Sequence, residues 1–382
     1  DAVCPPEKRS FKVSISDTLE DSLEGADIVF YNATTGLDEY ENYKSLGIPQ
    51  GAHIMFVAKK IKEICPNAWF LVNTNPPDVP LAAVHKKYKL DKLIGCCNAT
   101  VISKKVIFAY LCTGLGVNSN YKFCELGDSL QKIGEDDLQL HEIGINHDLW
   151  FYDVLLKGKS IYDDLRKSLP KHYNENILKS EYLDSFPEWK YAFKNNIELL
   201  KYTNYLPAPV GGSKRFTSLP LSSEELGKMM KRPSREDFHR CIKEGLGREE
   251  IMSIISRCGG GIPLYIADVV ETILSDSGKE CSVQVLNNGV LPCVPEDAML
   301  QMSCKLGRNK IDRPEIGKVP QFIIGALASR VFQNDMAACA LAEQDERLMV
   351  QAMLMMPERV TCKDAFRTVN EKDNAEPIIP LN

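Results

Sequence analysis

Three short polar stretches hold the side chains of this sequence that are best suited to chemistry. The first is Asn73-Thr74-Asn75-Pro76, which follows a continuous apolar run at residues 69–72. Asparagine amides at the end of a strand can hydrogen-bond a ribose or a substrate hydroxyl. The same residue types also form plain Asx turns before helices. A binding turn and an ordinary turn are therefore both open interpretations.

The second and third stretches are Cys97-Asn98 and Asn146-His147. Cysteine is among the most buried residue types, so core packing is the alternative for Cys97, as a structural role is for His147. Each of them, however, stands beside an asparagine near a predicted strand end. A thiolate and an imidazole, with substrate oxygens completing the shell, suit Mn, Fe, Co, Ni or Zn. The pair is therefore a candidate metal site.

Four further side chains could act as acids or bases, namely the carboxylates of Glu142 and Asp148 and the phenols of Tyr202 and Tyr205. Asp148 is more typical of a local hydrogen-bonding group, and most tyrosines are half-buried packing residues. The residues alone therefore do not select a base.

The elements that would position these residues alternate between strand and helix. Strands are predicted at residues 12–16, 26–33, 69–72 and 92–95, and helices at residues 19–25, 53–64 and 80–88. This alternation predicts an α/β fold with a doubly wound, Rossmann-like parallel sheet. In such sheets ligands bind at the carboxyl ends of the strands, where the first two polar stretches lie.

Later elements are expected to be more mixed. Alternation predicts a single strand over residues 138–151, with His147 near its end. Further predictions are a helix at residues 262–274, strands at 282–286 and 298–304, and two amphipathic helices within 320–356. We expect residues 1–151 to form the Rossmann-like domain and residues 152–382 a second, α+β domain.

A nucleotide-binding sheet normally opens with a strand, a GxGxxG turn and a helix. No such fingerprint precedes Lys12. We therefore expect the first βαβ unit to be missing from the sequence as given.

The bulk composition narrows the class of protein. With 382 residues the chain is long enough for two domains, and its net charge of −6 gives no reason to expect nucleic acid or an anionic membrane as partner. No apolar run reaches the roughly 18 residues that span a bilayer. The 13 cysteines are scattered and odd in number, which favours thiols in a reducing cytoplasm over a disulfide framework.

Taken together, several motifs resemble glycoside hydrolase family 4, the NAD- and metal-dependent glycosidases. The matching pieces are LEGADIVF, CPNAWFLVNTNP, IGCCN, GINHDLW, LNNGVLPCVPEDAMLQMSC and LMVQAMLMMP, in the family's order. The order of elements around TNYLPAP is more similar to the branch that acts on α-galacturonides and α-glucosides than to the 6-phosphoglycosidases.

The resemblance implies a function and a set of roles. A small glycoside would be cleaved by oxidation of the sugar C3 hydroxyl with NAD, removal of the C2 proton and elimination, instead of two-carboxylate hydrolysis. A divalent metal, Mn by expectation, would assist, and the protein would be a homodimer or homotetramer. The implied roles are metal binding for Cys97 and His147, sugar binding for Asn98 and Asn146, and cofactor binding for Asn73, Asn75 and Pro76. Apart from the resemblance, Thr35 is a further candidate for cofactor binding because small polar residues at a strand end suit close approach to a ligand, and Tyr205 is our candidate base.

Some family features are absent. Only Gln50-Gly51-Ala52-His53 stands where the family has a longer loop with a substrate-binding arginine. Residues 209–214 replace an Asp-Arg-His cluster, which leaves the base unidentified. Two alternatives therefore stay open: a lactate/malate-type dehydrogenase, which NTNPPDV also suits, and a non-catalytic relative that binds sugar or nucleotide.

Overall fold

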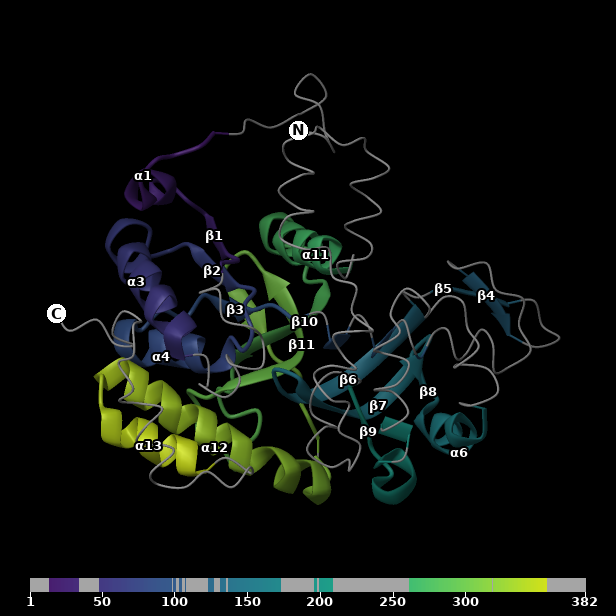
Figure 1. Cartoon of the computed structure of the whole chain (residues 1–382). Coiled ribbons are helices and arrows are strands. Elements are labelled where there is room, and N and C mark those ends of the chain that lie inside the picture. Colours follow the sequence, from purple (N-terminus) through teal and green to yellow (C-terminus); the bar gives the residue numbers. More distant parts are fainter. Residues whose placement is uncertain are drawn as a thin grey trace, which may run out of the picture. The chain divides into compact units, whose positions relative to one another are not determined.

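The structure, a computed structural model, describes residues 14–33, 48–97, 99–100, 103–104, 107, 123–126, 131–134, 137–172, 196–197, 199–208, 261–317 and 319–355. Figure 1 shows the helices and strands, coloured along the sequence. The chain divides into two compact units, each built from separate stretches of sequence. The first unit comprises Asp1–Ser16, Asn98–Leu140 and Val154–Asp268, and the second Asp17–Cys97, His141–Asp153 and Val269–Asn382. The single boundary between residues 151 and 152 stays a prediction.

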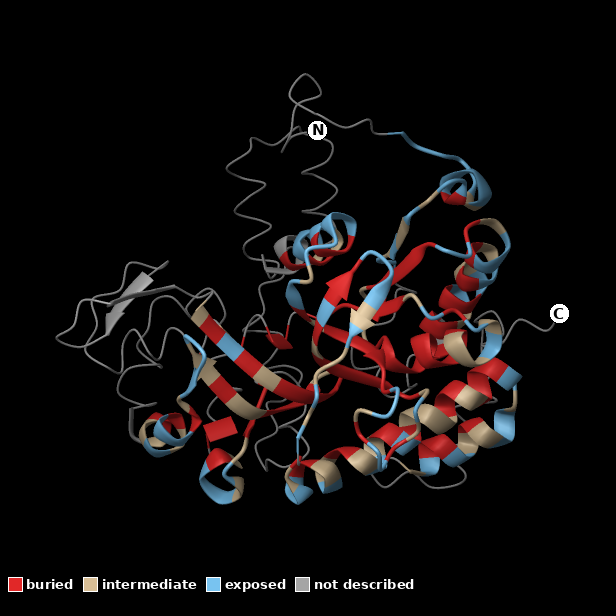
Figure 2. Ribbon diagram, turned by 180° about the vertical axis from the view of Figure 1, so that it is seen from behind, coloured by how far each residue is buried: buried red, intermediate tan, exposed pale blue. Residues whose placement is uncertain are grey.

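The second unit begins with three parallel strands. Strand β1 (Ile28–Tyr31) pairs with β2 (Trp69–Val72), and β2 pairs with β3 (Leu93–Gly95). Every residue of β2 is buried, as in a strand that is covered on both faces (Figure 2). The connecting helices are α1 (Leu19–Leu23), α3 (Ile48–Ile64) and α4 (Asp78–Tyr88). The predicted Rossmann-like start of an α/β sheet is thereby confirmed.

Antiparallel strands extend the same sheet. Strand β10 (Glu280–Leu286) pairs with β3 on one side and with β11 (Met299–Gly307) on the other. Strand β11 in turn pairs with β12 (Lys310–Asp312) and β6 (Leu138–Ile145), and β7 (Asp148–Leu156) follows β6 in the strand order. The strands predicted at 282–286 and 298–304 are confirmed, and they bring residues from late in the chain beside β3.

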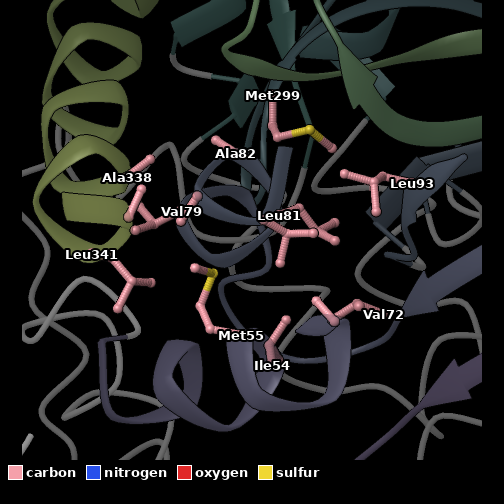
Figure 3. Packing of buried hydrophobic residues seen from close by; sticks show 14 of the residues in the cluster. Ile54, Met55, Val72, Val79, Leu81, Ala82, Leu93, Met299, Ala338 and Leu341 are labelled. Carbon is pink, nitrogen blue, oxygen red and sulfur yellow. The ribbon is translucent and has the colours of Figure 1, made fainter. Parts of the chain in front are cut away.

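Helices cover the parallel strands. Helix α4 packs against α3 and α12 (Gln321–Glu343), and α13 (Glu346–Leu354) packs on α12. Figure 3 shows side chains from these layers, including Met55, Leu81 and Leu341, gathered in one buried cluster. Each fully buried side chain of this size contributes about 1.5–3 kcal/mol. The cluster holds α4, and therefore the turn that precedes it, in place.

An ion-pair network also ties α4 to its surroundings. Lys86 Nζ lies 2.6 Å from Asp297 Oδ2 and 2.9 Å from Asp335 Oδ1 on α12. Burial opposes the charge of Lys86, but hydrogen bonds to the two carboxylates raise its pKa above the ordinary value. The network therefore favours charged Lys86 between the helix and the loop after β10.

The first unit is smaller in its described part. Helix α6 (Tyr162–His172) follows β8 (Lys159–Ser160), and Tyr162 accepts a hydrogen bond at its hydroxyl from the backbone of Leu206 in β9 (Leu206–Pro207) at 2.8 Å. A separate antiparallel pair joins β4 (Phe123–Leu126) to β5 (Gln131–Gly134). Helix α11 (Gly261–Ser275) continues from this unit into the second.

Two expectations about strands are wrong. Residues 138–151 do not form one strand, because the chain reverses at Asn146-His147 between β6 and β7. Apolar residues stand on both sides of this turn, and the turn itself lacks the usual glycine or proline signal. Residues 14–16 of the predicted strand at 12–16 are not strand, and Ile15 is 94% exposed; residues 12 and 13 lie outside the described part. Among the described helices, none is long and apolar enough to cross a membrane.

Candidate functional site

The carboxyl ends of β1 and β2 carry the first polar stretch. The backbone N–H of Asn73 donates to the Tyr31 carbonyl at 2.9 Å, and the Asn73 side chain donates to Asn32 Oδ1 at 3.2 Å. The next residue, Thr74, has a buried hydroxyl oxygen with no hydrogen-bond partner among the described residues. The Asn75-Pro76 peptide bond is cis. The turn thus presents amides and one unsatisfied hydroxyl at the edge where such sheets bind ligands.

A residue at the start of α3 stabilises this edge of the sheet. Gln50 is buried and donates from Nε2 to the Tyr31 hydroxyl at 2.9 Å and to the Ala33 carbonyl at 2.8 Å. Burial raises the pKa of Tyr31, and the hydrogen bond from Gln50 partly offsets this rise. Gln50, at the start of α3, therefore fixes the end of β1.

Cys97 lies at the end of β3, where it is buried. The preceding residue, Cys96, continues the ladder by donating its N–H to the Val72 carbonyl at 2.8 Å, and burial raises the pKa of its thiol. A Cβ atom on Gly95 would lie 2.8 Å from Gln284 Oε1 and 2.9 Å from Gln284 Cβ. Only glycine therefore allows β10 to bring Gln284 this close to the end of β3.

The third polar stretch is the turn of the β6–β7 hairpin. His147 has a φ of 60°, in the left-handed region where non-glycine residues are uncommon and where strain concentrates at functional sites. A Cβ atom on Gly144 would lie 2.6 Å from Leu149 Cα and would also overlap the Asp148 carbonyl oxygen. The sequence therefore permits this tight reversal only because residue 144 is glycine.

A buried hydrogen-bond network joins these turns. Asn146 Nδ2 donates to Asn75 Oδ1 at 2.6 Å, and Asn146 Oδ1 accepts from Gln284 Nε2 at 3.2 Å. The backbone N–H of Asn146 faces both oxygens of Asp78, at 3.1 and 3.3 Å. Gln284 Nε2 also lies 3.5 Å from Gln301 Oε1. One asparagine thus connects the turn after β2, the start of α4 and strand β10.

Asp78 is the most perturbed acid of this network. Its burial raises the pKa to about 7, against the lowering effect of the Asn146 N–H and of Arg330, and the neighbouring Asp148 adds to the rise. A buried acid that titrates near neutral pH is typical of functional sites.

The structure brings together most of the predicted site residues in the second unit. Asn75 and Asn146 are directly hydrogen-bonded, with Asn73 and Pro76 in the same turn as Asn75 and His147 next to Asn146. Cys97 follows β3, the neighbour of β2. No group of three or more His, Cys, Asp and Glu side chains able to hold a metal occurs in the described part of the chain. A metal on Cys97 and His147 would therefore need oxygens from substrate or water.

Three predicted site residues are not part of the hydrogen-bond network described above. Thr35 and Asn98 lie outside the described residues. Tyr205 belongs to the first unit, where its backbone N–H donates to Thr203 Oγ1 at 3.1 Å. Its role as base stays a prediction.

Two members of the network are missing from the sequence-based prediction. Asp78 reads as an ordinary acid in the first turn of a helix, which the helix dipole favours. Gln284 was detectable in principle, because it is a polar residue inside the apolar stretch Val283 to Leu286 of a predicted strand.

Comparison with known proteins decides the family. Residues 143–358, more than half of the chain, match the model for the family 4 glycosyl hydrolase C-terminal domain, and residues 45–113 match the model for family 4 glycosyl hydrolase. The chain belongs to family 4 of the glycosyl hydrolases. The resemblance in the sequence motifs is thereby confirmed at the level of the family.

Relatives of this family 4 chain differ in substrate. It is 24% identical to a 6-phospho-beta-glucosidase of Escherichia coli strain K12, with 67% of this chain and 52% of that protein covered. It is 22% identical to an alpha-galactosidase of Bacillus subtilis (79% and 63%) and 21% identical to an alpha-galacturonidase of Thermoanaerobacter italicus (96% and 85%). The matches thus span between half and two thirds of the first two relatives.

Solved structures share the fold. A putative glucosidase, lplD, from Bacillus subtilis gives a TM-score of 0.70 at 20% identity, with 91% of this chain and 83% of that chain covered. A 6-phospho-alpha-glucosidase from gut microorganisms in complex with NAD and Mn2+ gives 0.66 at 18% identity, with 94% and 84% covered.

Proposed function

We propose that this family 4 chain is a glycosidase that cleaves an α-glycoside by a redox-assisted elimination. In this reaction the sugar C3 hydroxyl is oxidised, the C2 proton is removed, the bond from C1 to the leaving oxygen breaks, water adds at C1, and C3 is reduced again. The observation that carries the proposal is the Asn75–Asn146 hydrogen bond at the strand ends of a chain that belongs to this family.

The turn after β2 fits a nicotinamide cofactor. Thr74 Oγ1 is buried and without a partner among the described residues, and Asn73 lies between the ends of β1 and β2. An unsatisfied buried hydroxyl is costly unless a ligand completes it. Asn73, Thr74 and Asn75 would thus hold the nicotinamide side of NAD, a cofactor that is bound in two structures of a 6-phospho-alpha-glucosidase with this fold.

The donor set also fits a divalent cation. The thiolate of Cys97 and the neutral imidazole of His147 would be a soft and an intermediate ligand for a divalent cation, and sugar hydroxyls would add the oxygen ligands that Mn²⁺ prefers. When bound, NAD supplies a hydride acceptor and the cation withdraws charge from the sugar oxygens. Asn146 would orient the sugar hydroxyls, and Tyr205 is the candidate base for the C2 proton.

The choice of an α-glycoside without a phosphate follows the residues around TNYLPAP, whose order of elements is more similar to the α-galacturonidase and α-glucosidase branch, and the extent of two sequence alignments supports it. The alignment with the alpha-galacturonidase covers 96% of this chain and 85% of that protein, whereas the alignment with the 6-phospho-beta-glucosidase covers 52% of the latter. A uronide or hexoside without a phosphate is therefore the proposed substrate. A homodimer or homotetramer is part of the same proposal, and light scattering of the purified protein measures it.

The test is a release assay with a panel of α- and β-linked nitrophenyl hexosides and uronides, with and without a 6-phosphate. We expect turnover of an α-linked, non-phosphorylated member only when NAD⁺ and Mn²⁺ are both present. Turnover of β-linked or phosphorylated members alone would overturn the substrate assignment. Turnover without NAD⁺, or net NADH formation from a hydroxy acid, would overturn the reaction.

A further inference from the structure

The Asn146-His147 turn is held by a residue to which the reaction gives no role. Both oxygens of Asp78 face the backbone N–H of Asn146, at 3.1 and 3.3 Å, across 68 positions of sequence. The Asp78 side chain is buried, and so is Asn146. A buried N–H without an acceptor costs about 1–3 kcal/mol, so this contact constrains the backbone at the turn.

The side chain of Asn146 is anchored as well. Its Nδ2 donates to Asn75 and its Oδ1 accepts from Gln284. With the contact to Asp78, these bonds fix Asn146 at its backbone and at both ends of its amide. The next residue, His147, keeps a left-handed φ of 60°, which persists only where surrounding contacts over-determine it.

We propose that Asp78 is a positioning residue, which fixes the Asn146-His147 turn so that the His147 imidazole is pre-organised to bind the divalent cation. The inference rests on the proposed metal-binding function of Cys97 and His147. Outer-shell groups that orient a metal ligand typically change metal affinity by 10- to 100-fold when they are removed. Asp78 acts through the turn and does not itself contact the cation.

An alternative role for Asp78 is to complement the dipole of α4, whose first residue it is. Asp345 provides a matched comparison for this role. Its side chain accepts the backbone N–H of Arg347 at 2.8 Å at the start of α13. Asp345→Ala therefore removes a carboxylate acceptor of a backbone N–H at a helix start, away from the turn.

The experiment is titration of the metal-free protein with Co²⁺, followed by calorimetry and by the thiolate-to-Co²⁺ absorption band in the near ultraviolet. We expect Asp78→Ala to weaken Co²⁺ binding by about 10- to 100-fold. Asp78→Asn retains an oxygen that can accept the Asn146 N–H and should restore most of the affinity. Asp345→Ala should bind Co²⁺ like the unchanged protein.

Asp78→Val fills the space of the carboxyl group without an acceptor, so it replaces Asp78→Ala if the alanine variant does not fold. Equal Co²⁺ affinity in the unchanged protein, Asp78→Ala (or Asp78→Val) and Asp78→Asn would overturn the inference alone. Absence of Co²⁺ binding by the unchanged protein would overturn the metal assignment, and this inference with it. Equal losses in Asp78→Ala and Asp345→Ala would assign Asp78 to general stability.

Discussion

Asp78 shows how one buried acid can change the behaviour of the chain with pH. Burial raises the pKa of its carboxyl group to about 7, whereas an aspartate in the unfolded chain has a pKa near 3.8. Between these values the unfolded chain has released a proton that the folded chain keeps. The group therefore contributes stability at low pH, and this contribution is lost as the pH rises through about 7.

The expected loss of stability with rising pH gives a prediction for Asp78→Asn, whose side chain cannot titrate. The free energy of unfolding of the unchanged protein, relative to that of Asp78→Asn, should fall by up to about 4 kcal/mol between pH 4 and pH 8. Urea unfolding at several pH values measures the difference. A difference that is flat or rises with pH would contradict the burial of a protonated Asp78.

Cys97 is the second residue whose environment makes a specific prediction. If its thiolate is a metal ligand, Cys97→Ser should weaken Mn²⁺ binding by at least about tenfold, because a hydroxyl does not ionise near neutral pH and is a far weaker ligand. Calorimetric titration of the metal-free protein measures this. Cys293→Ser changes an exposed cysteine and should leave the affinity unchanged. Equal affinities in both variants would count against the Cys97 assignment.

At the scale of elements, the hairpin of β6 and β7 is the feature that sequence reasoning missed. Apolar residues recur along both strands, and the two-residue turn between them contains no glycine or proline that would mark a reversal. The reversal is instead marked by Gly144, two residues earlier, where the strands approach too closely for a Cβ atom. That signal depends on the packing of the partner strand, so it is invisible in the sequence alone.

Gly144→Ala tests this explanation. Backbone atoms of Asp148 and Leu149 would meet the new methyl group and cannot rotate away, so we expect a loss of about 1–3 kcal/mol of stability. Thermal or urea unfolding measures it. Gly325→Ala is the control, because a Cβ atom on Gly325 would meet no atom within 4 Å outside the backbone of its own helix. Alanine also has a higher helix propensity than glycine, so the stability of the protein should rise slightly through α12. An unchanged stability of Gly144→Ala would contradict the tight reversal.

The Lys86 network makes a prediction about how α4 is held. Lys86→Met removes the cation between Asp297 and Asp335 and leaves the mostly buried Asp335 carboxylate without it, at a cost of about 2 kcal/mol. Lys310→Met breaks an exposed pair with Asp312 of similar length, 2.7 Å, and should reduce the free energy of unfolding much less, because solvent screens this pair. Urea unfolding compares the two. Equal losses would show that α4 does not depend on this network.

For the whole molecule, the parallel strands and their helices follow from local apolar runs, which is why the bounds of β2 agree with residues 69–72. The continuation of the sheet by β10 and β11 does not follow from local sequence, because β10 pairs Gln284 with Gly95 of β3, a residue from far earlier in the chain. The candidate site likewise has a part that the sequence predicts and a part that it does not. Its asparagines stand in visible turn motifs, whereas Asp78 and Gln284 join it only through tertiary contacts.

The central claim is that this chain breaks glycosidic bonds through chemistry at C2 and C3 of the sugar. The most direct measurement is turnover of the accepted glycoside in D₂O with NAD⁺ and Mn²⁺, with the product analysed by NMR. Removal of the C2 proton by a base exchanges it with solvent. The account predicts a product that carries deuterium at C2, and a product that retains its C2 hydrogen at full turnover would contradict it.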